Sequence, residues 1–370
     1  MTLDDTAPEV QETFDSRYSA AGSRALRLMA EHRAASSLPA LSAAVAIGSE
    51  TVWAGAVGFS DIAARTPATP ETLFRIGSTS KALTATALAR LVEGGAIELD
   101  TPLSSYLEKV PNQSWSAITA RQLASHSAGL PHYGENQDRI GLYRSISLDR
   151  HYDDVRDATS LFDDSALLFS PGTDFHYSSL GTVLLGAAMS HVSGLPYRDL
   201  MAREVFEPAG MASTFADGDR DPREVGLARF YFTDGERFRP WRKVDLSHRL
   251  PGGGFISSPK DLVQLGTMYF DAGYLSAETR ARFWQPQQLS DGSVNEQNYA
   301  LGWRWREWDI EGVGLVRAAS HGGVSRGSQC WLLLYPDYLM SMAFCTNVKT
   351  EEFDTFGRFY EPFFKSFVAP

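Results

Sequence analysis

The sequence predicts an α/β fold in which both ends of the chain contribute strands to one antiparallel sheet and a helical region is inserted between them. Short, apolar, strand-like segments occur within residues 41–59 and again within 299–346. The intervening residues, roughly 100–250, are mostly helix and loop sequence, and amphipathic helical patterns lie near both termini. This order of segments is typical of a sheet that is packed against helices and carries a helical insertion.

The N-terminal segments predict a helix followed by a hairpin. Residues 10–34 carry apolar positions at helical spacing and stop shortly before Pro39, so we expect one amphipathic helix there. Segments 41–48 and 51–59 are short, apolar and β-branched, and a Gly-Ser-Glu turn separates them. They predict the first two strands of the sheet.

A buried helix is predicted to begin at or just before Ser78. From there apolar residues recur every three or four positions until Gly94 and Gly95 end the pattern. The charged stretch 134–164 is only weakly periodic and predicts no clear element. The same rules predict further helices over 179–191, 261–270 and 351–367, and further strands over 299–305, 312–318, 328–335 and 339–346.

The composition excludes several classes of partner. Of 370 residues, 34 are Lys or Arg and 45 are Asp or Glu, which gives a formal net charge of −11. Nucleic acid and anionic membrane surfaces are bound by clustered basic residues, so we expect neither as a principal partner. Hydrophobic residues make up 43% of the chain, enough for a large core, which excludes disorder for most of it. A small molecule or a peptide is the expected substrate.

The two cysteines and the N-terminus indicate a cytoplasmic protein without a metal. Cys330 and Cys345 cannot frame a disulfide scaffold, and neither belongs to a His/Cys cluster with metal-ligand spacing. We interpret them as buried thiols in adjacent strands, although a cross-strand pair is geometrically allowed. The first ten residues are acidic where a signal peptide is basic, and no run of about 18 apolar residues occurs. A leader removed from the chain would change this expectation of a cytoplasmic location.

Two serine patterns compete for the role of nucleophile. Ser78 and Lys81 form a Ser-x-x-Lys at the start of a helix, where positions i and i+3 lie about 5–6 Å apart at Cβ. The lysine amine can accept the serine proton if burial lowers its pKa. The second pattern, Gly-x-Ser-x-Gly around Ser325, matches the nucleophile elbow of α/β-hydrolases.

The sequence context favours Ser78. The elbow requires a helix after its serine, but Ser325 is followed by a strand pattern over 329–334, so we interpret this match as coincidental. A second Ser-x-x-Lys, over 257–260, contains Pro259, which prevents a continuous helix through the motif. Ser78 opens the best buried helix, whose positive dipole end favours developing negative charge.

Residues 73–95, LFRIGSTSKALTATALARLVEGG, resemble the nucleophile segment of the serine β-lactamase and penicillin-binding-protein superfamily, in particular its class C, D-aminopeptidase and family VIII esterase branch. Further segments match in the same order along the chain. Among its members the chain looks most similar to the mitochondrial serine β-lactamase-like peptidases and their bacterial relatives. The matching segments are 123–130 (LASHSAGL), 170–181 (SPGTDFHYSSLG), 207–214 (EPAGMAST), 252–262 (GGGFISSPKDL) and 321–323 (HGG).

The resemblance implies a β-lactamase-like (DD-peptidase) fold and a set of site residues. It implies a single catalytic domain over 1–370, with an α/β subdomain over 10–77 plus 250–370 and a helical subdomain over 78–249. It implies no metal and no cofactor. The implied catalytic residues are Ser78 as nucleophile, Lys81 and Tyr177 as proton carriers, and His321. The resemblance implies the backbone N–H groups of Ser78 and Val324 as the oxyanion hole. The implied substrate-binding residues are Ser179, Gly322, Gly323, Gly253 and Gly254.

Two positions depart from the pattern of penicillin-hydrolysing members. Ser179 stands where most members have Asn, and a hydroxyl has fewer donors and a shorter reach than an amide. His321 replaces the lysine of the Lys-Thr-Gly element and is mostly neutral at pH 7, so it anchors a substrate carboxylate less well and instead hydrogen-bonds Tyr177 or the substrate. We interpret His126 and His132 as structural, and the alternating segment 303–308 as an amphipathic strand.

The resemblance therefore implies a serine hydrolase that acts on amide or ester bonds through an acyl-enzyme on Ser78. A peptidase is the first choice, followed by a carboxylesterase and a weak β-lactamase. Two alternatives stay open: an α/β-hydrolase that uses Ser325, and a non-catalytic, polymer-forming scaffold, which the Ser179 departure and the charged stretch 134–164 favour. Whether the protein forms a homo-oligomer is left open.

Overall fold

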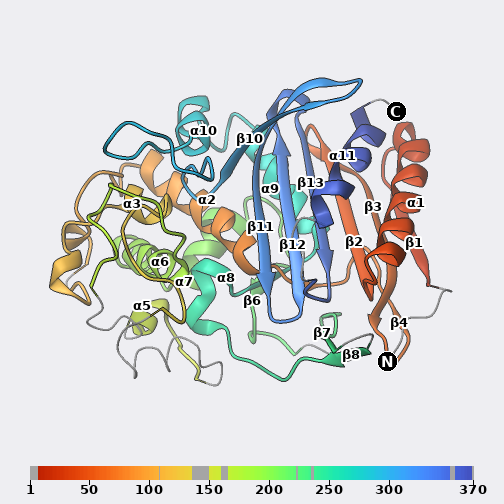
Figure 1. Ribbon diagram of the computed structural model, residues 1–370, viewed down its shortest axis with the longest axis horizontal. Coiled ribbons are helices and arrows are strands. Elements are labelled where there is room, and N and C mark those ends of the chain that lie inside the picture. The colour runs from red at the N-terminus through yellow and green to blue at the C-terminus, as the bar shows by residue number, and fades with distance from the viewer. Residues whose placement is uncertain are drawn as a thin grey trace.

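The computed structural model describes residues 7–107, 109–135, 150–159, 166–221, 224–234, 237–350 and 355–368. Its central feature is an eight-stranded antiparallel sheet in the order β1-β3-β2-β13-β12-β11-β10, with β4 attached to β3. The red and orange strands from the start of the chain lie beside the blue strands from its end (Figure 1). The strands are β1 Glu9–Thr13, β2 Ala40–Ile47, β3 Glu50–Asp61, β4 Thr66–Pro67, β10 Arg304–Ile310, β11 Gly314–Ser325, β12 Ser328–Tyr335 and β13 Met340–Thr346.

The two ends of the chain meet at the pairing of β2 with β13. This pairing is antiparallel and runs from Leu41 opposite Thr346 to Ile47 opposite Met340. Both strands consist almost entirely of buried residues because both faces of the sheet are covered. The predicted antiparallel sheet from both chain ends is therefore confirmed.

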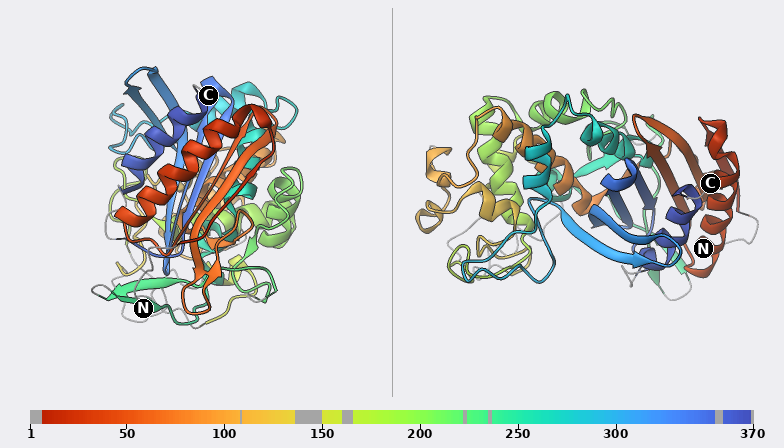
Figure 2. Two further views of the ribbon diagram at one scale, coloured as in Figure 1. Left: turned by 90° about the vertical axis from the view of Figure 1, so that its right-hand side faces the viewer. Right: turned by 90° about the horizontal axis from the view of Figure 1, so that it is seen from above.

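Helices cover the two faces of the sheet unequally. The terminal helices α1 (Ser19–Ala35) and α11 (Thr355–Val368) lie side by side on one face (Figure 2). Their aromatic core includes Phe344 of β13, whose ring centroid is 4.9 Å from that of Phe363. On the opposite face α9 (Pro259–Phe270) packs on β2 and β13, and Gly266 allows it to approach because a Cβ there would lie 2.2 Å from the Cβ of Ser341.

The helical region lies to one side of the sheet (Figure 1). At its centre is α2, whose side chains are almost all buried. Two small sheets, β5-β9-β6 and β7-β8, connect this region to the rest. The elements are α2 Ser80–Glu93, α3 Ala120–Ala124, α5 Val155–Ala158, α6 Ser179–Ser193, α7 Tyr197–Met201, the π-helical turn Ala202–Phe206, α8 Leu250–Gly253, α10 Ala277–Trp284, β5 Phe74–Arg75, β6 Phe215–Ala216, β7 Tyr231–Asp234, β8 Arg237–Pro240 and β9 Phe255–Ser257.

Three predictions of secondary structure are wrong at their edges. The predicted strand over 312–318 is β11, which continues to Ser325 because residues 319–325 pair with β12. The predicted helix over 10–34 begins only at Ser19, because residues 9–13 form β1 and pair with β3. The predicted strand over 299–305 begins only at Arg304, because Gly302 adopts φ +74° and turns the chain against α2. Part of the charged stretch 134–164, namely 136–149 and 160–164, lies outside the described residues.

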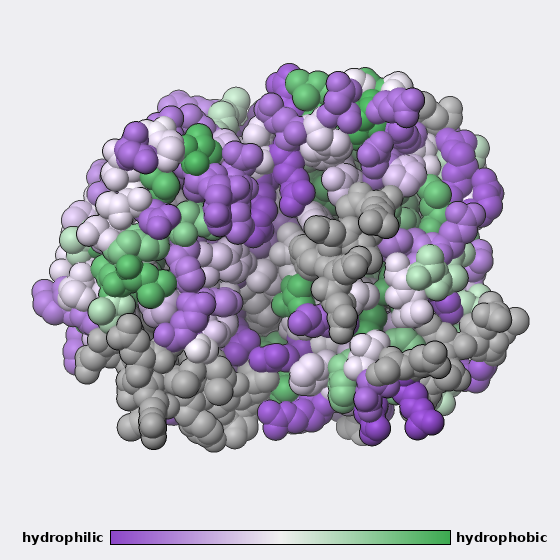
Figure 3. Space-filling model, viewed as in Figure 1, coloured by the Kyte–Doolittle hydropathy of each residue, from purple (hydrophilic) through white to green (hydrophobic). Residues whose placement is uncertain are grey.

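Two other expectations are supported. Cys330 and Cys345 face each other across β12 and β13, and both are free and buried. Ser325 ends β11 at the hairpin to β12, so the helix that a nucleophile elbow requires is replaced by a strand. The face in Figure 3 is mostly hydrophilic, with apolar residues in small separate patches.

No helix within the described part of the chain is both long and apolar enough to span a membrane.

Candidate functional site

Ser78 lies in a short 3-10 turn, Gly77–Thr79, that leads into α2. Lys81 follows on the first turn of that helix, and its Nζ lies 3.3 Å from the Ser78 Oγ. Gly77 adopts φ +51°, and a Cβ at this position would lie 2.6 Å from the carbonyl carbon of Val324. Only glycine therefore fits where the turn passes β11.

Lys81 is held by three hydrogen bonds in a buried position. It is 2% exposed, and besides Ser78 its Nζ donates to the Ser179 Oγ at 2.9 Å and to the Gly252 carbonyl oxygen at 2.7 Å. Burial lowers the pKa of Lys81 below its ordinary value, although nearby Tyr177 opposes this effect. A buried amine that gives up its proton more readily suits the proton acceptor of a serine nucleophile.

Tyr177 immediately precedes Ser178, whose side chain caps α6, and its ring lies over the lysine. The Lys81 Nζ is 4.8 Å from the centroid of this ring. Burial alone would raise the pKa of the phenol, but the positive charges of Lys81 and Arg304 outweigh it, so the pKa of Tyr177 is lowered. A phenol with this shift, next to the lysine, can relay a proton.

The backbone of β11 passes directly beside the nucleophile. A Cβ at Gly323 would lie 1.9 Å from the Ile76 carbonyl oxygen and 2.8 Å from the Ser78 nitrogen. The pairing of β10 with β11 reaches only Ser320, so none of the described strands pairs with that edge of β11 at Val324. The N–H groups of Ser78 and Val324 thus lie close together where a carbonyl oxygen can be bound.

His321 is completely buried and makes a different contact from the one expected. Its ring centroid is 6.5 Å from that of Tyr177, and its Nε2 instead lies 2.8 Å from the Tyr299 Oη. Its Nδ1 lies 2.8 Å from the Gly322 carbonyl oxygen, which can only accept, so Nδ1 carries the proton and Tyr299 donates to Nε2. Burial, followed by the charges of Arg304 and Lys81, holds the pKa of His321 well below its ordinary value.

Arg304 is a site residue that the sequence analysis missed. Its guanidinium carbon lies 5.5 Å from the ring centroid of Tyr177 and 5.0 Å from that of Tyr299, and Gln297 holds it through an Nη2 to Oε1 bond of 2.7 Å. The sequence signal was the arginine in the alternating segment 303–308, which we assigned to a strand only. Arg304 thus places a positive charge near the site, where the sequence analysis considered only the replacement of a lysine by His321.

The predicted substrate-binding residues take different places. Ser179 is 4% exposed and bound to Lys81, so its hydroxyl orients the lysine. A Cβ added at Gly253 would lie 3.5 Å from the Gly77 carbonyl carbon, an ordinary contact, and the Gly254 carbonyl oxygen accepts from the Asp217 N–H. Neighbouring Gly252, which the sequence analysis did not select, is the glycine that contacts the lysine.

The structure places the serine and the lysine of the competing Ser-x-x-Lys motif apart from each other. Ser257 lies in β9, where its hydroxyl contacts Thr214, whereas Lys260 reaches the surface and pairs with Glu71 at 2.5 Å. Ser258 and Pro259 begin α9 between them. This pair therefore provides a natural control for Ser78 and Lys81.

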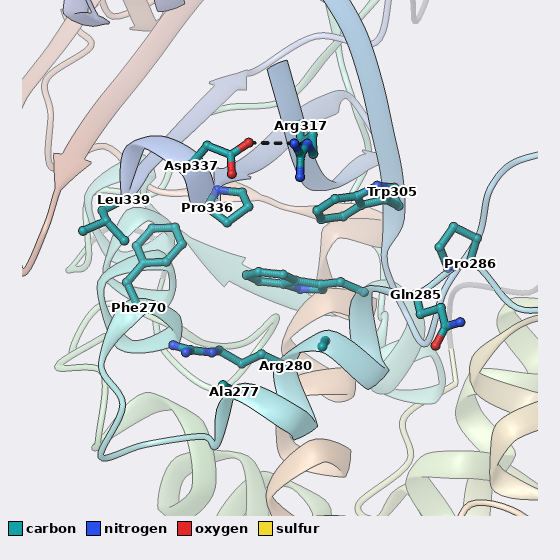
Figure 4. A pocket seen from close by; sticks show the side chains of 12 residues that line it. Phe270, Ala277, Arg280, Gln285, Pro286, Trp305, Arg317, Pro336, Asp337 and Leu339 are labelled. Atoms are coloured by element: carbon teal, nitrogen blue, oxygen red, sulfur yellow. Dashed lines mark ion pairs between the residues drawn. The ribbon is translucent and has the colours of Figure 1, made fainter. Parts of the chain in front are cut away.

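A separate cavity includes Trp305, the residue after Arg304, but none of the site residues described above. Its volume is about 530 Å³, and it opens between α10, β10 and the turn after β12. Phe270, Trp305 and Leu339 form its apolar walls, and Arg317 pairs with Asp337 across it at 3.6 Å (Figure 4). None of the catalytic residues expected from the sequence lines it.

The described residues contain no group of three or more His, Cys, Asp or Glu side chains that could hold a metal ion. The chemistry offered by this part of the chain is that of a serine beside a buried amine, a phenol and two backbone N–H groups.

Comparison with known proteins identifies the family. The Beta-lactamase family model matches residues 26–361. The mitochondrial serine beta-lactamase-like protein LACTB of Mus musculus is 27% identical, over 82% of this chain and 71% of its own length. Esterase EstB of Burkholderia gladioli is 31% identical, over 69% of each chain.

Solved structures share the fold. The D-amino acid amidase from Ochrobactrum anthropi superposes with a TM-score of 0.76 at 22% identity, covering 94% of this chain and 98% of its own. The expected β-lactamase-like fold and superfamily are confirmed. The chain belongs to the Beta-lactamase family and, with it, to the serine hydrolases.

Proposed function

We propose that the protein hydrolyses amide or ester bonds through an acyl-enzyme on Ser78. One observation carries this proposal: the buried amine of Lys81, whose pKa is lowered, lies 3.3 Å from the Ser78 Oγ. Ser78 in turn lies beside the end of β11, where the edge that carries the backbone N–H of Val324 is not paired with another described strand. A scaffold protein would not require a buried, desolvated lysine in this position, because burying its charge costs free energy. This favours the enzyme over the polymer-forming scaffold.

The reaction follows from the placement of these groups. The Ser78 Oγ attacks the substrate carbonyl carbon while Lys81 accepts the serine proton. The oxyanion accepts hydrogen bonds from the N–H groups of Ser78 and Val324. Tyr177 and Lys81 return the proton to the leaving group. A water molecule then attacks the acyl carbonyl while the same two residues take its proton and deliver it to the Ser78 Oγ, which releases the acid and restores the serine. Neutral His321 holds Tyr299 in place beside Tyr177.

A peptidase is the preferred activity, with an esterase second. Arg304 places a positive charge over Tyr177, where it can attract the carboxylate of a peptide substrate. The same charge removes one argument against β-lactams, which also carry a carboxylate, so weak β-lactam hydrolysis stays the third candidate. A small activated ester needs no such anchor and is the simplest substrate for assays.

Labelling with a fluorophosphonate probe tests the nucleophile. We expect the wild type to be labelled and Ser78→Ala to lose at least about 99% of the labelling, because the probe reacts with an activated serine hydroxyl. Ser325→Ala is the matched control, since Ser325 is also a serine beside glycines but lies at a hairpin. Equal labelling of wild type and Ser78→Ala would refute the proposal, and selective loss in Ser325→Ala would establish the α/β-hydrolase alternative.

The pH dependence of kcat/KM tests the role of the lysine. Because burial lowers the pKa of Lys81, we expect kcat/KM for an uncharged ester to rise with pH and to level off below the ordinary pKa of lysine. The buried histidines contribute no step near pH 6.5, since the pKa values of His126 and His321 are both lowered well below that value. A profile that falls from pH 6 to 9, after subtraction of spontaneous hydrolysis, would contradict a neutral amine as base.

A further inference from the structure

His132 lies beside the catalytic tyrosine and leaves one ring nitrogen open. Its Nδ1 lies 3.1 Å from the backbone nitrogen of Ser179, whose N–H can only donate, so Nδ1 accepts and Nε2 carries the proton of the neutral ring. The ring meets that of Tyr177 edge-on, with centroids 5.9 Å apart. Among the described residues Nε2 has no hydrogen-bond partner, and unlike the Nε2 of His126 it is not sealed from solvent.

This open nitrogen remains a neutral donor across the neutral pH range. Burial, followed by the positive charge of Lys81, lowers the pKa of His132 to about 4, against the opposing effect of Glu135. At neutral pH the ring therefore carries no charge, and its proton stays on Nε2. A neutral N–H donor suits a neutral acceptor such as an amide carbonyl rather than a carboxylate.

The other polar side chains near Tyr177 are either hydrogen-bonded or sealed from solvent, and the Nε2 of His126, which has no partner, is of the second kind. Ser179 is 4% exposed and its Oγ accepts from Lys81. His126 is 3% exposed, and its Nδ1 accepts from the Ser178 N–H. Both nitrogens of His321 have partners in Tyr299 and Gly322. His132 is therefore the histidine of this group that retains an open donor.

We propose that His132 binds the substrate: its Nε2–H donates a hydrogen bond to a carbonyl oxygen in the acyl part of the substrate, one amide removed from the scissile bond. This assigns the substrate class as N-acylated amino acid or peptide derivatives rather than simple acyl esters. The assignment rests on the proposed acyl-enzyme at Ser78. It replaces our interpretation of His132 as purely structural, and it explains how a site with a buried serine at position 179 still contacts an amide.

Two esters of matched length isolate this hydrogen bond. The p-nitrophenyl esters of N-acetylglycine and of pentanoic acid have acyl chains of equal length, but only the first has an amide carbonyl. We expect the wild type to prefer the N-acetylglycyl ester, and His132→Phe to lower its kcat/KM about tenfold, as for the loss of one hydrogen bond. The pentanoate should change less than about threefold. Rates are corrected for spontaneous hydrolysis.

His132→Gln separates binding from structure. Glutamine keeps an acceptor for the Ser179 N–H and an N–H donor, so we expect it to restore most of the preference for the N-acetylglycyl ester. An equal loss for both esters in His132→Phe, without rescue by glutamine, would show that His132 acts only by supporting Ser179 and would overturn the proposal. If the ratio of kcat/KM for the two esters were unchanged in both variants, the proposal would be overturned as well.

Failure of the underlying reaction gives a different result. If Ser78 is not the nucleophile, the wild type is not labelled at Ser78 by the fluorophosphonate probe, whichever ester it prefers. If Ser78 is labelled in the wild type and in both His132 variants but the ester preference does not move, only the role of His132 fails. If His132→Phe does not fold, the ratio of kcat/KM for the two esters in the wild type and in His132→Gln still tests the proposal. A wild type without preference for the N-acetylglycyl ester contradicts it.

Discussion

Replacement of Lys81 by methionine is expected to lower kcat/KM for an activated ester by about 10³-fold or more, because the variant removes the proton acceptor beside Ser78. Methionine is close to lysine in length and needs no hydrogen bond in a buried site. The pH dependence expected for the wild type should disappear together with the amine. Steady-state kinetics between pH 5 and 10 measure both effects.

The fold should tolerate this change. In the folded protein the pKa of Lys81 is lowered, so at pH values between the folded and unfolded pKa the unfolded chain binds more protons, and stability rises with pH there. Below the folded pKa the cost of burying the charge is fully present, and methionine removes it. Thermal unfolding at pH 7 should therefore show no large loss of stability.

Lys260→Met is the matched control for the lysine. This residue belongs to the second Ser-x-x-Lys motif, but it pairs with Glu71 and Glu12 at the surface. We expect its activity to stay within about twofold of the wild type, since exposed pairs contribute little. Full activity in Lys81→Met would exclude the lysine as proton acceptor.

Gly323→Ala is expected to lower kcat/KM by about 10²-fold or more. The new Cβ would lie 1.9 Å from the Ile76 carbonyl oxygen and 2.7 Å from the Thr79 nitrogen, and both are backbone atoms that cannot rotate away. β11 must therefore shift from the nucleophile turn, which separates the N–H groups of Ser78 and Val324. Loss of one oxyanion donor typically costs about 10²–10³ in kcat. The added methyl should also lower stability by about 1–3 kcal/mol.

Gly181→Ala provides the control for an added methyl group. Gly181 lies within α6, and a Cβ there would meet its nearest atoms at 3.6 Å, an ordinary contact. Alanine is also the better helix former, so we expect equal or higher stability and unchanged activity. If Gly323→Ala kept wild-type kcat/KM, the N–H group of Val324 could not be part of the oxyanion hole.

The sequence was sufficient to predict elements whose signal is local. β12 was predicted with its observed bounds because the mainly apolar run SQCWLLLY stands between two turn sequences. Helix α6 follows from its serine cap and apolar pattern. Ser78 and Lys81 were predictable because a spacing of three at a helix start fixes their distance, whatever the rest of the fold does.

Groups placed by distant segments were not predictable. β1 is only five residues long, and these residues form a strand because they pair with the edge of β3. Arg304, Tyr299 and Gly252 make contacts that join residues far apart along the chain. Periodicity contains no information about such contacts, which depend on tertiary packing.

The charge of the chain also gains a more specific meaning. From the net charge of −11 we expected no nucleic-acid partner, and from His321 in place of a lysine we expected a site with little attraction for carboxylates. Because Arg304 lies near Tyr177, the local charge there is positive although the chain as a whole is acidic. At short range such local groups outweigh the net charge in setting the electrostatic potential at Tyr177.

Trapping the covalent intermediate tests the central proposal most directly. The protein is mixed with p-nitrophenyl acetate, quenched in acid during turnover, digested and analysed by mass spectrometry. We predict an acetyl group on Ser78 in the wild type, its absence in Ser78→Ala, and no acetyl group on Ser325. Turnover of the ester with an acetyl group on Ser325, or with no acyl-enzyme at Ser78 at any time of quenching, would contradict the assignment of Ser78 as nucleophile.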